Sequence, residues 1–213
     1  MKTIGFFGDS FCAGREPESW CVLLADQLDV QITHWGEPGK SIWTTFFKFN
    51  QLHTANRLPD ICILCYTEPY RLYHPSFILS ANTEPVKGVD PTVYKALEQY
   101  WIHLHNYDKD ELAYEYALKW FDHDVLSKIK NKTIVQMWSF RPFETAGKDA
   151  GIKLTSGIFI DESLYASSLT ENIPSGGITM PWGRGIINHM SAEQNKLWAD
   201  KIYAAIKDNE SRS

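Results

Sequence analysis

The sequence predicts an α/β protein in which a mainly parallel five-stranded sheet is covered by helices on both faces, as a three-layer α/β/α sandwich. Short apolar runs typical of strands alternate along the chain with longer segments in which apolar residues recur at helical spacing. The run at residues 60–66 is apolar at nearly every position, which is typical of a strand buried on both faces. Strands that alternate with helices pair in parallel, because each helix returns the chain to the same end of the sheet.

Five segments are expected to be strands, because each is a short apolar run. In chain order they are residues 2–7, 30–35, 60–66, 133–138 and 157–160. Gly8-Asp9-Ser10 ends the first strand and Gly36-Glu37-Pro38-Gly39 ends the second, and these residue types favour turns. The segments that follow the third and fifth strands lack periodicity and are long for simple connections, which indicates functional or loosely ordered loops.

Five segments are expected to be helices, because each has an apolar stripe at helical spacing. They are residues 18–28, a segment that starts after Ser41 and reaches His53, residues 91–105, residues 109–129, and a last helix that starts after His189. Ser191 and Gln194 form a capping box for the last helix. No linker or repeat divides the chain, so we expect a single domain over 1–208 and a disordered tail over 209–213.

Composition excludes several classes of function. The 213 residues are 44% hydrophobic and carry a net charge of −5 without any basic stretch, so nucleic acid is not an expected partner. No apolar run approaches the roughly 18–20 residues that a membrane span needs. The amino-terminal residues enter a strand almost directly, without the pattern of a signal peptide, so we expect a cytoplasmic protein that does not bind membranes. No sequence feature indicates an oligomeric state.

The four cysteines are expected to be buried free thiols. Cys62 and Cys65 form a C-x-x-C pattern, but residues three apart on a strand point to opposite faces, which suits neither a shared zinc ion nor a disulfide. No second pair of ligands is present, and no histidine spacing resembles a metal site. We therefore expect neither a metal nor a cofactor.

Ser10 is the strongest candidate for a functional residue. It stands where the first strand ends and the chain turns toward a helix, a geometry that exposes a hydroxyl and leaves backbone N–H groups free to stabilise an oxyanion. A Gly-Asp-Ser tripeptide can also be a simple turn. The position after the first strand gives it weight, because ligands of parallel sheets bind at the carboxyl ends of the strands.

Three short blocks resemble the SGNH (GDSL-like) hydrolase family, whose fold is flavodoxin-like. Phe6-Phe7-Gly8-Asp9-Ser10-Phe11 resembles the first block, Gly36-Glu37-Pro38-Gly39 resembles the second, and His189 before the last helix matches the family histidine. The resemblance implies that Ser10 is the nucleophile, that Gly39 donates a backbone N–H to the oxyanion, and that His189 is the general base.

Two blocks depart from the family pattern. Where the family has Gly-x-Asn-Asp after the third strand, this chain has Cys65-Tyr66-Thr67-Glu68, so the Thr67 hydroxyl is the candidate replacement for the asparagine as an oxyanion donor. Ile186 stands where the family has the aspartate that orients the histidine. A backbone carbonyl near Ile186 would leave a Ser–His dyad, whereas Asp161, expected at the end of the fifth strand, would complete a triad. Glu68 and Arg184 are candidate substrate contacts.

The sequence thus predicts a serine hydrolase that cleaves short-chain acyl esters, with acetylated carbohydrates among the candidate substrates. Its partner would be a small-molecule or glycan ester. The altered blocks leave a second interpretation open, a catalytically weak or inactive module of the same fold that binds a ligand or glycan. A third is a flavodoxin-like nucleotide binder, although the chain has neither G-x-G-x-x-G nor G-x-x-x-x-G-K-[ST].

Overall fold

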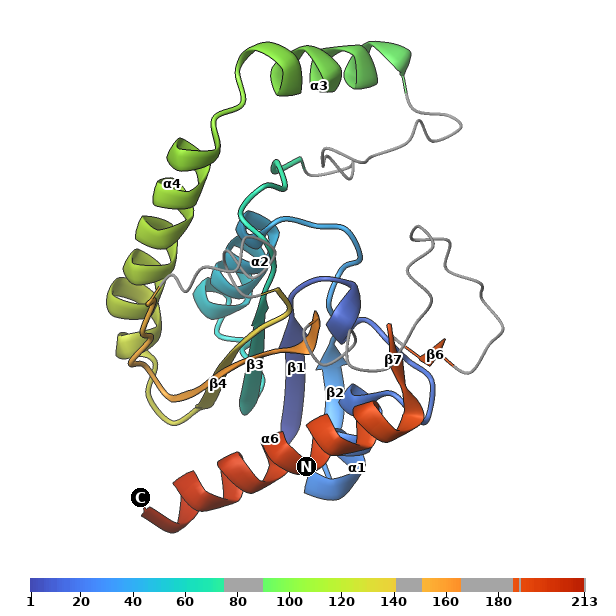
Figure 1. Cartoon of the computed structure of the whole chain (residues 1–213). Helices are drawn as coiled ribbons and strands as arrows, with labels where there is room; N and C mark the ends of the chain where they lie inside the picture. Colours follow the sequence, from blue (N-terminus) through green and yellow to red (C-terminus); the bar gives the residue numbers. More distant parts are fainter. Residues whose placement is uncertain (75–89, 141–150, 166–185, 188, 213) are drawn as a thin grey trace.

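A five-stranded parallel sheet forms the centre of the molecule, as the sequence predicts. The computed structural model describes residues 1–74, 90–140, 151–165, 186–187 and 189–212 (Figure 1). The sheet has the strand order β2-β1-β3-β4-β5, and every pair of neighbours is parallel. Its strands are β1 (Thr3–Phe7), β2 (Gln31–His34), β3 (Ile61–Tyr66), β4 (Thr133–Trp138) and β5 (Ile158–Ser163).

Helices cover the two faces of the sheet and give the expected three layers. The long helices are α1 (Trp20–Leu28), α2 (Ile42–Thr54), α3 (Pro91–His103), α4 (Tyr107–Trp120) and α6 (Ala192–Arg212). One apolar core includes Leu24 of α1 and Trp198 of α6, and the other includes Phe46 of α2 and Leu118 of α4. Figure 1 shows α3 lying beyond the end of the sheet rather than on either face, and Leu97 is its one buried residue.

Strand β3 shows how the two cores divide the sheet. All six of its residues are buried. Ile63 and Cys65 belong to the core beneath α1 and α6, while Cys62 and Leu64 belong to the core beneath α2 and α4. The four cysteines are buried and free, so the expectation of opposite faces and unpaired thiols is confirmed.

The expected helix at 109–129 ends earlier than its periodicity indicates. After Trp120 the chain forms a π-helical turn, Phe121–Val125, and a 3-10 turn, Leu126–Lys128. The buried carboxylate of Asp122 accepts hydrogen bonds from the backbone N–H groups of Thr155 and Ser156, each at 2.9 Å, and from Gln136 Nε2 at 2.7 Å. This network lies where the regular α-helix gives way, and it joins the turn to β4 and to the segment before β5.

The carboxyl terminus is helical where the sequence predicted a disordered tail. Helix α6 continues to Arg212, so residues 209–212 are helical. Lys207 Nζ lies 2.8 Å from the Glu210 carboxylate, and Lys2 Nζ lies 3.6 Å from the same side chain. Such exposed pairs add little stability individually. The buried stripe of the helix extends as far as Ile206 and provides its main contact with the sheet.

A short antiparallel hairpin precedes α6 and was not expected from the sequence. Its strands are β6 (Ile186–Ile187) and β7 (Met190–Ser191), and His189 lies in its turn with a φ of 67°. Asn195 holds β7 in place, because its Nδ2 donates to the carbonyls of Met190 (3.3 Å) and Ser191 (2.9 Å). Its Oδ1 accepts from Trp20 N at 2.9 Å. The hairpin that carries His189 is therefore attached to the start of α1.

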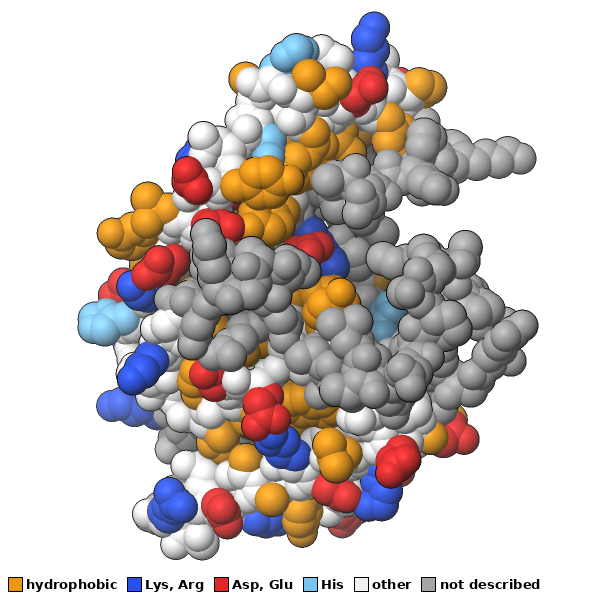
Figure 2. All heavy atoms as spheres, in the orientation of Figure 1, with side chains coloured by type: hydrophobic (Ala, Val, Ile, Leu, Met, Phe, Trp, Pro, Cys, Tyr) orange, Lys and Arg blue, Asp and Glu red, His pale blue; other side chains and the backbone are white. Residues whose placement is uncertain are grey.

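The distribution of charged side chains on the surface agrees with the modest net charge. Acidic and basic side chains alternate over the lower part of the face shown in Figure 2, without gathering by sign. Among the described residues, no helix is long and apolar enough to cross a membrane.

Candidate active site

Ser10 begins a 3-10 turn at the carboxyl end of β1. The turn spans Ser10–Cys12, and Asp9 is its N-cap, because Asp9 Oδ1 accepts a hydrogen bond from Phe11 N at 3.0 Å. As the first residue of the turn, Ser10 has a backbone N–H without an acceptor inside the turn. Its side chain is half-buried, whereas Asp9 is fully buried. The loop therefore presents a hydroxyl and a backbone donor at one edge of the sheet.

The loop after β2 is bonded directly to the loop that holds Ser10. Glu37 N donates to Gly8 O at 2.8 Å, and Gly36 N donates to Cys12 O at 3.0 Å. Gly36 must be glycine for this approach, since a Cβ there would stand 2.6 Å from Asp9 O. Gly39 ends the loop in the left-handed region, with a φ of 71° that favours glycine. The expected first and second blocks thus lie against each other.

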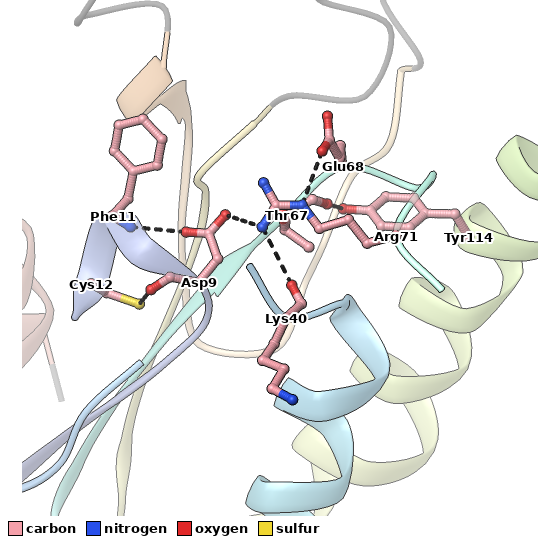
Figure 3. Close-up of polar contacts among 8 residues, drawn as sticks. All are labelled: Asp9, Phe11, Cys12, Lys40, Thr67, Glu68, Arg71 and Tyr114. Atoms are coloured by element: carbon pink, nitrogen blue, oxygen red, sulfur yellow. Dashed lines mark hydrogen bonds and ion pairs between the residues drawn. The ribbon is translucent and has the colours of Figure 1, made fainter. Parts of the chain in front are cut away.

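Arg71, in the loop after β3, joins all three loops (Figure 3). Its Nε donates to Glu68 Oε1 at 2.9 Å, and its Nη1 lies 3.5 Å from both Asp9 Oδ2 and Lys40 O. The contact with Asp9 is an ion pair without hydrogen-bond geometry. Only 11% of the Arg71 side chain is exposed. Two of its partners, Asp9 and Lys40, come from loops far away along the chain, so residue order alone does not indicate this cluster.

Thr67 lies at the carboxyl end of β3, where the family asparagine would stand. Its side-chain oxygen is buried and has no hydrogen-bond partner among the described residues. Its backbone oxygen accepts a hydrogen bond from the Tyr114 hydroxyl of α4, which fixes the backbone at this point. Figure 3 shows Thr67 beside Arg71 and Asp9, so an unused hydroxyl lies within the same cluster.

His189 packs beside the serine loop. Its ring centroid lies 4.8 Å from that of Phe11, the residue after Ser10. Burial lowers the pKa of the His189 imidazole below its ordinary value, and the positive charge of Arg71 lowers the pKa further, while the negative charge of Asp9 raises it. The net direction is down, which favours the neutral imidazole. Among the contacts of the described residues, none is a hydrogen bond between His189 and Ser10.

Asp161 does not join this group in the described contacts. Its Oδ1 accepts a hydrogen bond from Trp138 Nε1 at 3.0 Å, and its side chain is exposed. Trp138 belongs to the core beneath α2 and α4, whereas Met190, next to His189, belongs to the core on the other face. Arg184, the other distant candidate, lies outside the described residues.

The predicted site residues that meet at one edge of the sheet are those of the loops after the first three strands and of the hairpin. They are Ser10, Gly39, Thr67, Glu68 and His189. The described residues contain no group of three or more metal-binding side chains. A hollow of about 1080 Å³ lies at the opposite edge, beside Met1, Asp60 and Lys132, and a smaller one of about 440 Å³ borders Glu37 and Tyr73.

Comparison with known proteins identifies the fold. No family model matches the sequence, and no curated protein matches it significantly. Among solved structures, the chain is similar to the esterase EstA from Pseudoalteromonas, with 11% identity, a TM-score of 0.50, and coverage of 99% of this chain and 100% of that one. It is also similar to the acetyl xylan esterase Est2A from Butyrivibrio proteoclasticus, with 11% identity, a TM-score of 0.50, and coverage of 99% and 64%.

Further solved structures that resemble the chain include a G-D-S-L family lipolytic protein from Desulfitobacterium hafniense, with 13% identity, a TM-score of 0.41, and coverage of 96% and 99%. The first two similarities extend along almost the whole chain and agree with the parallel sheet and its covering helices. At such low identity they concern architecture and not residue roles. The chain therefore has the α/β fold of the SGNH (GDSL-like) hydrolases.

Proposed function

We propose that this protein is a serine hydrolase that cleaves short-chain acyl esters, with Ser10 as the nucleophile and His189 as the general base. The observation that carries the proposal is the packing of the His189 ring on Phe11, directly after Ser10 in the chain. The fold adds support, because similar structures that span the same sheet include esterases. A small-molecule or glycan ester is the expected substrate.

The proposed reaction is acyl transfer to water in two steps. The neutral imidazole of His189 takes the proton of the Ser10 hydroxyl as the oxygen attacks the ester carbonyl. The protonated imidazole then gives that proton to the leaving alcohol, and a water molecule activated in the same way releases the acid. The lowered pKa of His189 suits this role, since a base must be unprotonated at working pH.

The oxyanion would be stabilised by backbone N–H groups of Ser10 and Gly39 together with Arg71. The third block lacks its asparagine, and loss of one such donor typically costs about 10²–10³ in turnover. The Nη2 group of Arg71 has no hydrogen-bond partner in the described part of the chain, and Figure 3 shows it without a dashed line. A guanidinium fixed by Glu68 and Lys40 O is a positioned positive charge, and the Thr67 hydroxyl is a second donor nearby.

Asp9 would stabilise the imidazolium in the absence of the family aspartate. Its fully buried negative charge raises the pKa of His189, which means that it favours the protonated ring. Ile186, at the position of that aspartate, has no polar side chain. The contact with Phe11 limits the orientation of the ring. In this proposal a Ser–His dyad works with a charged neighbour, and Asp161 is not needed.

The test is hydrolysis of 4-nitrophenyl acetate and butyrate by the wild type, Ser10→Ala and His189→Ala. We expect the turnover of both variants to fall at least about 10³-fold, because neither member of the dyad acts without the other. Circular dichroism checks that each variant is folded. Full activity in Ser10→Ala would refute the assignment of the nucleophile.

The alternative is a glycan-binding module of this fold that has lost catalysis, favoured by the changes at Thr67 and Ile186. A fluorophosphonate probe separates the two proposals, because it reacts covalently only with an activated serine. Stoichiometric labelling of the wild type that disappears in Ser10→Ala and falls in His189→Ala supports the hydrolase. An unlabelled, folded wild type supports the binding module.

A further inference from the structure

Helix α2 carries exposed aromatic side chains beside the candidate active site. The helix buries Ile42, Phe46 and Phe49, which face the sheet, but Trp43 and Phe47 remain 38% and 51% exposed. These two residues and Gln51 are spaced by four, so they lie along one outward stripe of the helix. Tyr73, from the loop after β3, is 43% exposed.

These rings form a connected surface. The centroids of Phe47 and Tyr73 are 4.8 Å apart in an edge-to-face arrangement, and those of Trp43 and Phe47 are 6.5 Å apart. Phe47 and Tyr73 also line the hollow of about 440 Å³, with Glu37, Thr44, Lys48 and Gln51 as its other walls. Aromatic groups beside a few convergent polar side chains are characteristic of ligand sites.

The hollow is attached to the active-site loops. Glu37 belongs to the loop that ends at Gly39, and its backbone N–H is bonded to Gly8 O. Tyr73 follows Arg71 by two residues in the loop after β3. Lys40 Nζ donates to His74 O at 3.4 Å and thereby holds these two loops together. The hollow therefore borders two of the loops that form the candidate active site.

We propose that this hollow is a subsite for a neutral carbohydrate, which holds the sugar of an acylated saccharide while its ester reaches Ser10. The link of this subsite to catalysis rests on the proposed function, whereas the class of its ligand is inferred from the residues that line the hollow. A pyranose ring has apolar C–H faces that pack on aromatic rings, and hydroxyl groups around its edge that need polar partners. Phe47 and Tyr73 provide the aromatic rings. The polar partners for the hydroxyl groups are Glu37, Lys48 and Gln51.

Charge excludes the simplest competing ligands. Lys48 Nζ lies 3.2 Å from Glu37 Oε1, so the lining of the hollow has no net charge that would select an anion or a cation. A long acyl chain offers no hydrogen-bond partner to the polar side chains of four of the six residues lining the hollow, whereas the hydroxyl groups of a saccharide do. A neutral ligand with apolar faces and a polar edge fits both observations.

Calorimetric titration of the Ser10→Ala protein with unmodified xylo- and cello-oligosaccharides tests the subsite without any hydrolysis. We expect binding to weaken about three- to tenfold in Phe47→Ala and in Tyr73→Ala, because each variant loses one aromatic contact. Tyr116→Ala is the matched control, because this residue of α4 is 65% exposed and lies outside the hollow, and its variant should bind normally. Failure of the parent protein to bind either saccharide, or equal weakening in the control, would overturn the inference.

Kinetic measurements on proteins that keep Ser10 separate this inference from the proposed function. In Phe47→Ala and Tyr73→Ala, we expect KM for an acetylated xylo-oligosaccharide to rise while kcat/KM for 4-nitrophenyl acetate stays within about twofold. This is the pattern expected when a variant loses binding energy that the ground state and the transition state share. A selective loss on 4-nitrophenyl octanoate instead would identify an acyl-chain site and refute the carbohydrate. Saccharide binding by a protein inert toward every ester would support the subsite and contradict the hydrolase.

Discussion

Arg71 and Asp9 form an ion pair whose worth can be estimated from its geometry. At 3.5 Å and an effective dielectric constant of about 20, the attraction between unit charges is about 5 kcal/mol. Breaking buried pairs costs about 3–5 kcal/mol, because a charge is left without its partner. Asp9 is fully buried and Arg71 is 11% exposed, so we expect Arg71→Met to lower the free energy of unfolding by about 3 kcal/mol.

A double-mutant cycle tests this reasoning by urea unfolding. In Asp9→Asn the amide oxygen can still accept from Phe11 N, so the N-cap is retained. The double variant has no unpaired carboxylate and should be at least about 2 kcal/mol more stable than the sum of the single effects indicates. The control is Lys48→Met, which breaks a shorter pair of 3.2 Å whose side chains are 44% and 38% exposed, and should cost less than about 1 kcal/mol. Strict additivity in the cycle would refute a coupled pair.

Three further predictions concern pH, stability and thiol reactivity. The rate of ester cleavage should rise with pH through an apparent pKa below the ordinary value of about 6.5, and this pKa should move up in Arg71→Met and down in Asp9→Asn, as a pH profile of kcat/KM will show. Asp122→Ala should cost about 3 kcal/mol at pH 7 by urea unfolding, and less at acid pH. Burial raises the pKa of Asp122, but its hydrogen bonds together lower it by more, so the net direction is down. Its contribution is therefore present above the unfolded carboxyl pKa and is lost as the pH falls through the folded pKa. The cysteines should resist a disulfide reagent at pH 8 until the protein unfolds, because burial raises their pKa values, that of Cys62 to about 12, and a native thiol that reacts within seconds would contradict this.

The sheet was predictable because its signals are local. Each strand is a short apolar run, and β3 in particular reads as apolar because both of its faces are buried. The end of α4 was not predictable in this way. Its apolar stripe continues past Trp120, and the change of helix type coincides with hydrogen bonds that Asp122 accepts from residues 33 and 34 positions later in the chain. Tertiary contacts override a periodic pattern at such places.

The residues of the candidate site likewise differ in whether a local sequence pattern indicates them. Ser10 was accessible to sequence reasoning because turn chemistry marks the end of its strand, and Gly39 because its loop resembles the second block of the SGNH family. Asp161 was placed at a strand end, but β5 continues to Ser163, so this residue stands within the strand with its carboxylate on Trp138. The role of Arg71 depends on partners that are distant along the chain. Its partner Asp9 lies 62 residues earlier, and only the meeting of parallel strand ends brings the two together.

In the proposed mechanism, the Asp9–Arg71 pair meets a requirement that neither charge meets alone. Two opposite charges develop as Ser10 attacks: a negative charge on the ester oxygen and a positive charge on His189. Arg71 favours the negative charge on the ester oxygen but disfavours the imidazolium, because it lowers the pKa of His189. Asp9 raises that pKa and therefore favours the imidazolium. A lone cation would stabilise the oxyanion and make the base too weak. Because the partners are joined, each developing charge would have a neighbour of opposite sign, and the proposed mechanism would then need neither the family asparagine nor the family aspartate.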